Sequence, residues 1–263
     1  MAFVGKDHYW YRCFDHRHFR FKGIDQNKKA AGLIISRFFD WASCLCYDGN
    51  MKKLFLDIET LPASGESMTI VKDLFEEQKK KNGARSRGKF GMTESATSFD
   101  SYFRGTSFSG EFGRIFCIGY AVNDQPAECL VGDEKDMLEK FWQIASDASV
   151  FVGHNVMDFD LRFIYKRSII LGVRPTQDLS FARYRSNPIF DTMREWEKWG
   201  STGVSLHKLA LALGIESSKN GDIDGSQVYD FFLAGKTTEI CDYCKRDVEV
   251  TRKIYNRINF IKK

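Results

Sequence analysis

The run from Leu54 to Thr60 constrains the fold most. Three apolar residues in it are followed by two carboxylates, Asp57 and Glu59, which are separated by one residue. A short apolar run with polar residues on both sides is typical of a buried β-strand. Residues two apart on a strand share a face, so Asp57 and Glu59 are expected to point the same way beside a hydrophobic core. Adjacent carboxylates there repel each other and lose hydration unless a cation or proton compensates. Mg²⁺ uses such ligands together with substrate phosphate oxygens. The run therefore predicts a metal site or, alternatively, a strand end with two solvated acids.

Composition bounds the class of protein. The 263 residues are 43% hydrophobic and 14% aromatic, enough for one large α/β domain or two small ones. The net charge of +4 is compatible with a polyanionic partner but does not indicate one. Cys241 and Cys244 form a CxxC pair within a helical pattern and are interpreted as reduced thiols. The odd number of cysteines and the lack of a secretory signal favour a reducing cytoplasm, and no apolar stretch approaches the roughly 20 residues that span a bilayer.

Residues 1–50 differ from the rest of the chain, with many aromatic residues and no clear hydrophobic period. We interpret them as an N-terminal extension outside the native domain, dispensable for activity, with Met51 as the natural start. His and Cys pairs in this segment are spaced by a single residue, which is not the spacing of zinc knuckles. The functional domain is expected to comprise residues 51–263.

From Met51 onward the sequence alternates strand and helix patterns. A hairpin is expected from strands at 114–122 and 127–131, and a further strand at 149–153. Helices are expected over 68–81, 134–146, 161–171, 192–199, 206–213, 226–233 and 238–261. The basic run 79–89 is interrupted by glycine and serine and is interpreted as a mobile loop, either solvated or contacting phosphates. Together these patterns predict a mixed sheet covered by helices.

Further acids follow later elements. Asp160 comes just past the strand at 149–153, and ligands of open α/β sheets usually lie at the carboxyl ends of strands. Tyr243 and Asp247 are four residues apart on the last helix and share a face. Taken singly, Asp160 is equally well explained as a helix cap, and Tyr243 with Asp247 as a surface pair.

In this order the residues resemble the DEDD superfamily of 3′–5′ exonucleases, in the subclass with Tyr in its third motif. More narrowly, the chain resembles free-standing predicted exonucleases related to the proofreading domain of family B DNA polymerases. The resemblance covers residues 51–263 and includes Gly113-Arg114-Ile115, Asp191-Thr192, Ser205-Leu206 and residues 218–226. The second motif, Asn-x-x-x-Phe-Asp, matches Asn155, Phe159 and Asp160, so Asp160 rather than Asp158 takes the family's metal role.

The resemblance implies an α/β, ribonuclease-H-like fold: a five-stranded mixed sheet with the first strand central, flanked by helices, with residues 61–112 as an inserted basic and helical segment. It implies two divalent cations, Mg²⁺ or Mn²⁺, and a Tyr243 that orients the attacking water. The implied metal ligands are Asp57, Glu59, Asp160 and Asp247. The expected substrate contacts are the backbone of Thr60 and the side chains of Leu61, Asn155 and Phe159, with Leu61 and Phe159 packing against terminal bases.

The implied function is a metal-dependent 3′–5′ exonuclease that releases nucleoside 5′-monophosphates from single-stranded DNA or a frayed 3′ end. An RNA 3′-trimming exonuclease of the ribonuclease D type is an alternative, because the motifs do not read the 2′-hydroxyl. A nucleic-acid-binding module without catalysis is a third reading. The expected partner is single-stranded nucleic acid, DNA rather than RNA, with no membrane. Because the sequence contains no polymerase portion, proofreading would require a polymerase or repair protein in trans.

Overall fold

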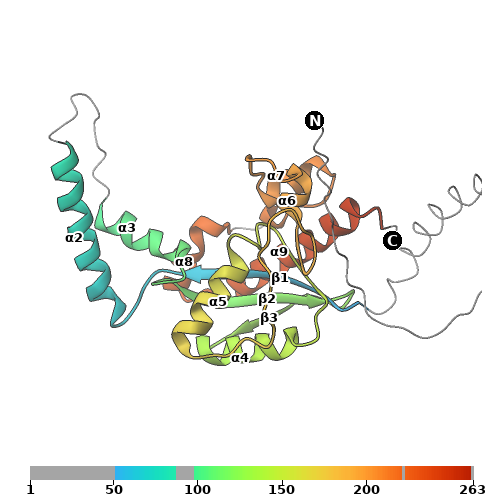
Figure 1. The fold of residues 1–263 in the computed structure, drawn as a ribbon, viewed down its shortest axis with the longest axis horizontal. Helices are drawn as coiled ribbons and strands as arrows, with labels where there is room; N and C mark the ends of the chain where they lie inside the picture. The colour runs from blue at the N-terminus through green and yellow to red at the C-terminus, as the bar shows by residue number, and fades with distance from the viewer. Residues whose placement is uncertain (1–50, 87–97, 221–222, 262–263) are drawn as a thin grey trace, which may run out of the picture. The chain divides into compact units, whose positions relative to one another are not determined.

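The structure, a computed structural model, describes residues 51–86, 98–220 and 223–261 (Figure 1). The predicted extension 1–50 and the basic residues Arg87 and Lys89 lie outside the described residues.

A five-stranded mixed sheet forms the centre of the described domain. Its strands are β1 (Lys53–Leu61), β2 (Arg114–Val122), β3 (Glu128–Val131), β4 (Val150–Gly153) and β5 (Ile189–Asp191), in the order β3-β2-β1-β4-β5. β1 is central; it pairs antiparallel with β2 and parallel with β4. The predicted fold class, with the first strand central, is confirmed. β5 was not predicted from the sequence, because its three residues are too few to show a period.

The two faces of the sheet bury different residues of β1. Leu54, Leu56 and Ile58 pack in the cluster that contains residues of α4 (Glu134–Ala145) and α5 (Asp160–Leu171). The alternate residues Phe55 and Leu61 pack instead in clusters with residues of α9 (Thr237–Ile258). Because side chains alternate along a strand, Asp57 and Glu59 lie on the α9 side.

The α4 and α5 layer agrees with the predicted pattern. The helix expected over 134–146 is observed as α4, and its inward face is buried: Met137, Leu138, Phe141, Trp142 and Ala145. Asp133 caps α4 by accepting hydrogen bonds from the amides of Lys135 and Asp136, and Gly172 ends α5 in the left-handed conformation with φ 69°. Arg167 of α5 binds both carboxylate oxygens of Glu134, which ties the two helices together.

On the other face, α9 packs beside three short helices: α6 (Thr192–Glu197), α7 (Leu206–Ala212) and α8 (Val228–Leu233). The short 3₁₀ turns η2 (Ser218–Asn220) and η3 (Gly225–Gln227) precede α8, so the helix expected over 226–233 starts as a 3₁₀ turn. The helix expected over 192–199 ends at Glu197, because Lys198 and Trp199 have positive φ angles of 48° and 64°. The last helix ends at Ile258, three residues before its predicted end.

The segment 61–112 is more helical than predicted. α2 (Ser67–Ser86) includes Lys79–Lys81, which lie in the helix expected over 68–81, and it continues through Arg85. The prediction of a loop was therefore wrong for residues 82–86. A further helix, α3 (Phe99–Gly105), and the 3₁₀ turn η1 (Thr106–Phe108) follow. Phe75 of α2 packs on Phe99 and Tyr102 of α3, with ring centroids 5.5 and 5.3 Å apart. Among the described residues, no helix combines the length and the apolar character that crossing a membrane requires.

Candidate active site

β1 presents Asp57 and Glu59 towards α9 near its carboxyl end. Glu59 is buried, with 7% of its surface exposed, and Asp57 is half-buried. The register with β2 shifts between Glu59 and Thr60, so the strand is irregular directly after the second carboxylate. The two carboxylates and the Cys244 thiol have ligand atoms within 4.8 Å of one another.

Asp160 joins this pair from the first turn of α5. Its Oδ1 accepts a hydrogen bond of 3.1 Å from the backbone amide of Ile58, the residue between the two β1 acids. The loop from β4 to α5 therefore delivers a third carboxylate directly onto β1. Asp160 is 3% exposed, and burial raises its pKa to about 7 despite the hydrogen bonds from backbone amides.

α9 contributes Tyr243 and Asp247, one turn apart on its buried face. The helix lies close to the sheet because Gly119 of β2 has no side chain; a Cβ there would lie 2.7 Å from the Cys244 sulfur. Gly119 is the antiparallel partner of Asp57, so the closest approach of α9 occurs beside that acid. The Tyr243 hydroxyl hydrogen-bonds to Asp247, and burial together with that carboxylate raises the pKa of Tyr243.

The four carboxylates are electrostatically coupled. Burial raises the pKa values of Asp57 and Glu59 well above their usual range, and the charges of Asp247 and Asp160 raise both further. Asp247 Oδ1 is a buried oxygen for which the described residues provide no hydrogen-bond partner. Buried, mutually repelling oxygens with an unused acceptor are the donor set that hard divalent cations prefer, so these residues fit the implied metals.

The expected substrate contacts fall into two groups. Phe159 is half-buried, Phe108 is 73% exposed, and the centroids of their rings lie 6.5 Å apart. Because Phe159 directly precedes Asp160, this aromatic surface borders that acid. Thr60 joins this border because its hydroxyl donates to the carbonyl of Ser107, the neighbour of Phe108. Leu61 does not join it: its side chain is fully buried in a cluster with residues of α9, which leaves no surface for a base.

Asn155 lies in the turn after β4, where it adopts a φ of 61° and its backbone N–H donates to Oδ1 of Asp191. Asp191 also accepts from the amides of Met157, Met193 and Arg194, so one buried carboxylate holds this turn against the start of α6. Asp191-Thr192 is one of the sequence matches to the exonuclease family. The hydrogen bonds of Asp191 to a turn 34 to 36 residues earlier in the chain could not be predicted from the sequence.

Besides the hydrogen bonds of Asp191, the contact of the Cys244 thiol with Asp57 was not predicted from the sequence. The thiol donates to the carbonyl oxygen of Asp57 at 3.5 Å and to Oδ2 of the same residue at 3.6 Å. Its position three residues before Asp247 on a helix was visible in the sequence, but its contact with β1 depends on the close approach of α9.

Comparison with known proteins bears on the fold and on the family of the chain. No curated protein matches the chain in sequence. Among solved structures, the chain is similar to the family B DNA polymerase from the hyperthermophilic archaeon Pyrobaculum calidifontis, with a TM-score of 0.54 and 16% identity. The match covers 80% of this chain and only 25% of the polymerase, and it shows a shared fold.

A family profile described as "predicted 3'-5' exonuclease related to the exonuclease domain of PolB" matches residues 121–263, more than half of the chain. The matched part contains Asp160, Tyr243 and Asp247, whereas Asp57 and Glu59 precede it. The chain therefore belongs to the family of predicted 3′–5′ exonucleases related to the exonuclease domain of PolB.

Proposed function

We propose that the protein is a metal-dependent 3′–5′ exonuclease that removes nucleoside 5′-monophosphates from single-stranded DNA. One observation carries the proposal: β1, α5 and α9 bring four largely buried carboxylates together, and the charges of Asp247 and Asp160 act on both Asp57 and Glu59. Such a cluster is costly on its own and becomes favourable when divalent cations bind.

Asp57, Glu59, Asp160 and Asp247 would hold these cations. When bound, two divalent ions stabilise the charge that develops on a phosphodiester during in-line displacement and favour ionisation of the attacking water. The protein's own part is to fix the carboxylates: Asp160 through the Ile58 amide, and Asp57 through the Cys244 thiol. Both anchors are made by buried groups, so the site is formed before the substrate arrives.

Tyr243 positions the attacking water in this proposal. Its hydroxyl can donate one hydrogen bond, and a tyrosine hydroxyl also accepts, so it can hold a water beside Asp247. The raised pKa of Tyr243 keeps the hydroxyl protonated at neutral pH. It is therefore a positioning group rather than a general base.

A cavity of about 480 Å³ lies next to the end of β1 and provides a path for the 3′ end of the substrate. It is lined by residues of β1, α3, η1, η3 and α8, among them Thr60, Arg104, Ser107, Phe108 and Tyr229. Phe108 connects this cavity to Phe159 and hence to Asp160. Aromatic rings of this kind stack on unpaired bases, which a duplex does not present, so the path favours a single strand.

The deciding experiment follows the degradation of a single-stranded oligodeoxynucleotide labelled at its 5′ end, with Mg²⁺ or Mn²⁺ and with EDTA. We expect a ladder that shortens from the 3′ end, nucleoside 5′-monophosphate products, and no cleavage in EDTA. Release of the 5′ label without labelled intermediate fragments, or cleavage that EDTA does not reduce, would contradict the proposal.

Ribo- and deoxyribo-oligonucleotides of the same sequence test the substrate, each used unlabelled as a competitor and, labelled at its 5′ end, as a substrate. For the DNA assignment we expect the deoxy-oligonucleotide to compete more strongly and to be degraded faster. Faster degradation of the ribo-oligonucleotide would assign the activity to RNA 3′-trimming instead, with the same carboxylates.

A further inference from the structure

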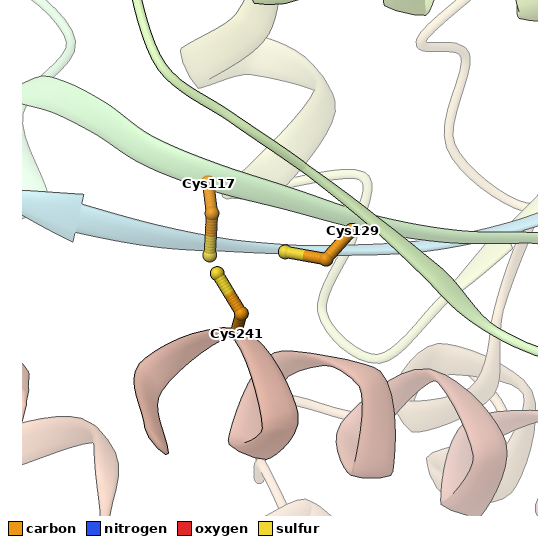
Figure 2. A group of neighbouring side chains, drawn as sticks. All are labelled: Cys117, Cys129 and Cys241. Atoms are coloured by element: carbon orange, nitrogen blue, oxygen red, sulfur yellow. The ribbon is translucent and has the colours of Figure 1, made fainter. Parts of the chain in front are cut away.

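The four cysteines of the described residues lie together, although they come from three separate elements. Cys117 belongs to β2, Cys129 to β3, and Cys241 and Cys244 to α9. The sulfur atoms of Cys117, Cys129 and Cys241 all lie within 4.8 Å of one another. Figure 2 shows the three side chains directed towards one another across the space between the sheet and α9.

The sheet register explains how the two strands contribute. Cys117 is the partner of Val131, and Cys129 is the partner of Gly119, so the two cysteines are diagonal neighbours on the same face of the β2–β3 pair. Cys241 and Cys244 are three residues apart on α9 and share its inward face. The absent side chain of Gly119 allows that face to come close.

Packing alone does not account for this arrangement. Buried free cysteines behave as small apolar residues, and such residues need not direct their polar atoms at one another. Here the sulfur atoms of three cysteines from β2, β3 and α9 are directed towards one another and lie within 4.8 Å (Figure 2). The neighbouring thiols and the positive charge of Lys245 lower the pKa of Cys129. The cluster is thus suited to hold a thiolate, which is the form that binds metals.

We infer that Cys117, Cys129 and Cys241 form a binding site for a thiophilic cation of the Zn²⁺ class. Zinc–sulfur bonds of about 2.3 Å in a tetrahedral site separate the sulfurs by about 3.8 Å, so a small contraction of the present spacing is sufficient. Three protein ligands leave a fourth position for another donor. Cys129 is half-buried and gives the ion a route in, while Cys117 and Cys241 are buried.

This site is distinct from the carboxylate site in chemistry. Thiolates select soft or borderline ions, whereas carboxylate oxygens select Mg²⁺, Mn²⁺ and Ca²⁺. Cys244 lies between the two groups: it packs in the same cluster as Cys117, Cys129 and Cys241, and its thiol donates to Asp57. The inference does not depend on the proposed nuclease activity, because it concerns ion binding by a separate set of residues.

Cd²⁺ is the probe for the test, because its bonds to thiolates absorb in the ultraviolet and its bonds to carboxylates do not. The full chain is used with Cys13, Cys44 and Cys46 replaced by Ser, so that only the described cysteines remain, and excess Mg²⁺ is present to occupy the carboxylates. We expect thiolate–cadmium absorption that saturates at a single equivalent. Cys129→Ser and Cys241→Ser should each abolish the saturable absorption while the circular dichroism spectrum stays unchanged.

A second measurement avoids folding effects of substitutions. Alkylation of Cys129 by iodoacetamide, followed by mass spectrometry of the full chain, should slow strongly in Zn²⁺ and remain unchanged in Mg²⁺. The inference is overturned if Zn²⁺ leaves the rate unchanged, if the cadmium absorption survives Cys129→Ser, or if the protein purified without reductant contains a disulfide among these cysteines in place of free thiols.

Discussion

The Cys244 sulfur of α9 lies 3.6 Å from Oδ2 of Asp57, a residue 187 positions earlier in the chain. This contact shows how closely the last helix approaches the central strand. Gly119 makes the approach possible, since it is the strand position that faces Cys244.

Gly119→Ala tests that dependence. The added Cβ would lie 2.7 Å from the Cys244 sulfur and 3.1 Å from a methyl carbon of Val248, so α9 must shift. We expect a loss of about 1–3 kcal/mol in the free energy of unfolding, measured with urea, and a lower nuclease rate. Gly105→Ala is the control for stability, because its Cβ would meet no atom within 4 Å. Equal stability of the two variants would show that α9 does not need the glycine.

A second prediction concerns the metal-free protein and pH. Asp160 has a pKa of about 7 in the folded chain and near 3.8 when unfolded, so folding takes up a proton between these values. Its contribution to stability is complete below pH 4 and is lost as the pH rises through 7, by about 4 kcal/mol. In EDTA we expect Asp160→Asn, which removes this titration, to be more stable than the unmodified protein at pH 8 and not at pH 4.

Added Mg²⁺ should reverse that order at pH 8, because the cation stabilises the ionised carboxylates and Asn is a poorer ligand. Thermal denaturation of both proteins, with EDTA or Mg²⁺ at each pH, measures the effect. A stability difference that does not change between pH 4 and pH 8 would contradict the prediction.

Tyr243→Phe removes a hydroxyl that contacts Asp247. We expect kcat to fall about tenfold, the effect of one hydrogen bond of about 1.4 kcal/mol, with little change in KM. The loss should be smaller than that caused by removing a carboxylate. An unchanged kcat would exclude Tyr243 from the mechanism, and a rise in KM alone would make it a substrate contact.

The aromatic border should act on binding. Phe159→Ala and Phe108→Ala each remove a ring that is positioned to stack on a base, and such stacking contributes about 1–3 kcal/mol. We therefore expect KM for single-stranded DNA to rise about 5- to 100-fold. Ile169→Ala is the matched control, because Ile169 is 75% exposed on α5 and lacks a ring. A similar KM in all three variants would remove the rings from the substrate path.

Much of the fold was predictable because its elements are long or regular. The strand at 114–122 was placed at its observed ends, and the helix expected over 134–146 differs from α4 only by its last residue. Short elements were not: β5 has three residues, and Lys198 ends α6 through a left-handed conformation that the sequence does not mark. The basic run continued as helix through Ser86 despite its glycine, where a loop was predicted.

For the candidate site, periodicity predicted that Asp57 and Glu59 share one face of a strand and that Tyr243 and Asp247 share one face of a helix. That these acids meet in one site was an expectation from the resemblance to the exonuclease family. What escaped prediction depends on distances between elements. The burial of Leu61 follows from how deeply α9 covers the end of β1, and the meeting of four cysteines follows from strand register. Neither leaves a local pattern in the sequence.

The most direct measurement of the central claim compares Asp160→Asn with Asp158→Asn in the 3′-end degradation assay with Mg²⁺. The two acids are neighbours in sequence, but Asp160 is buried against β1, whereas Asp158 is exposed and pairs with Arg194 and Arg162. We predict that Asp160→Asn lowers the rate about a thousandfold, equivalent to about 4 kcal/mol, while Asp158→Asn retains most of it. Full activity in Asp160→Asn, with its fold intact, would contradict the proposal that these carboxylates form the active site.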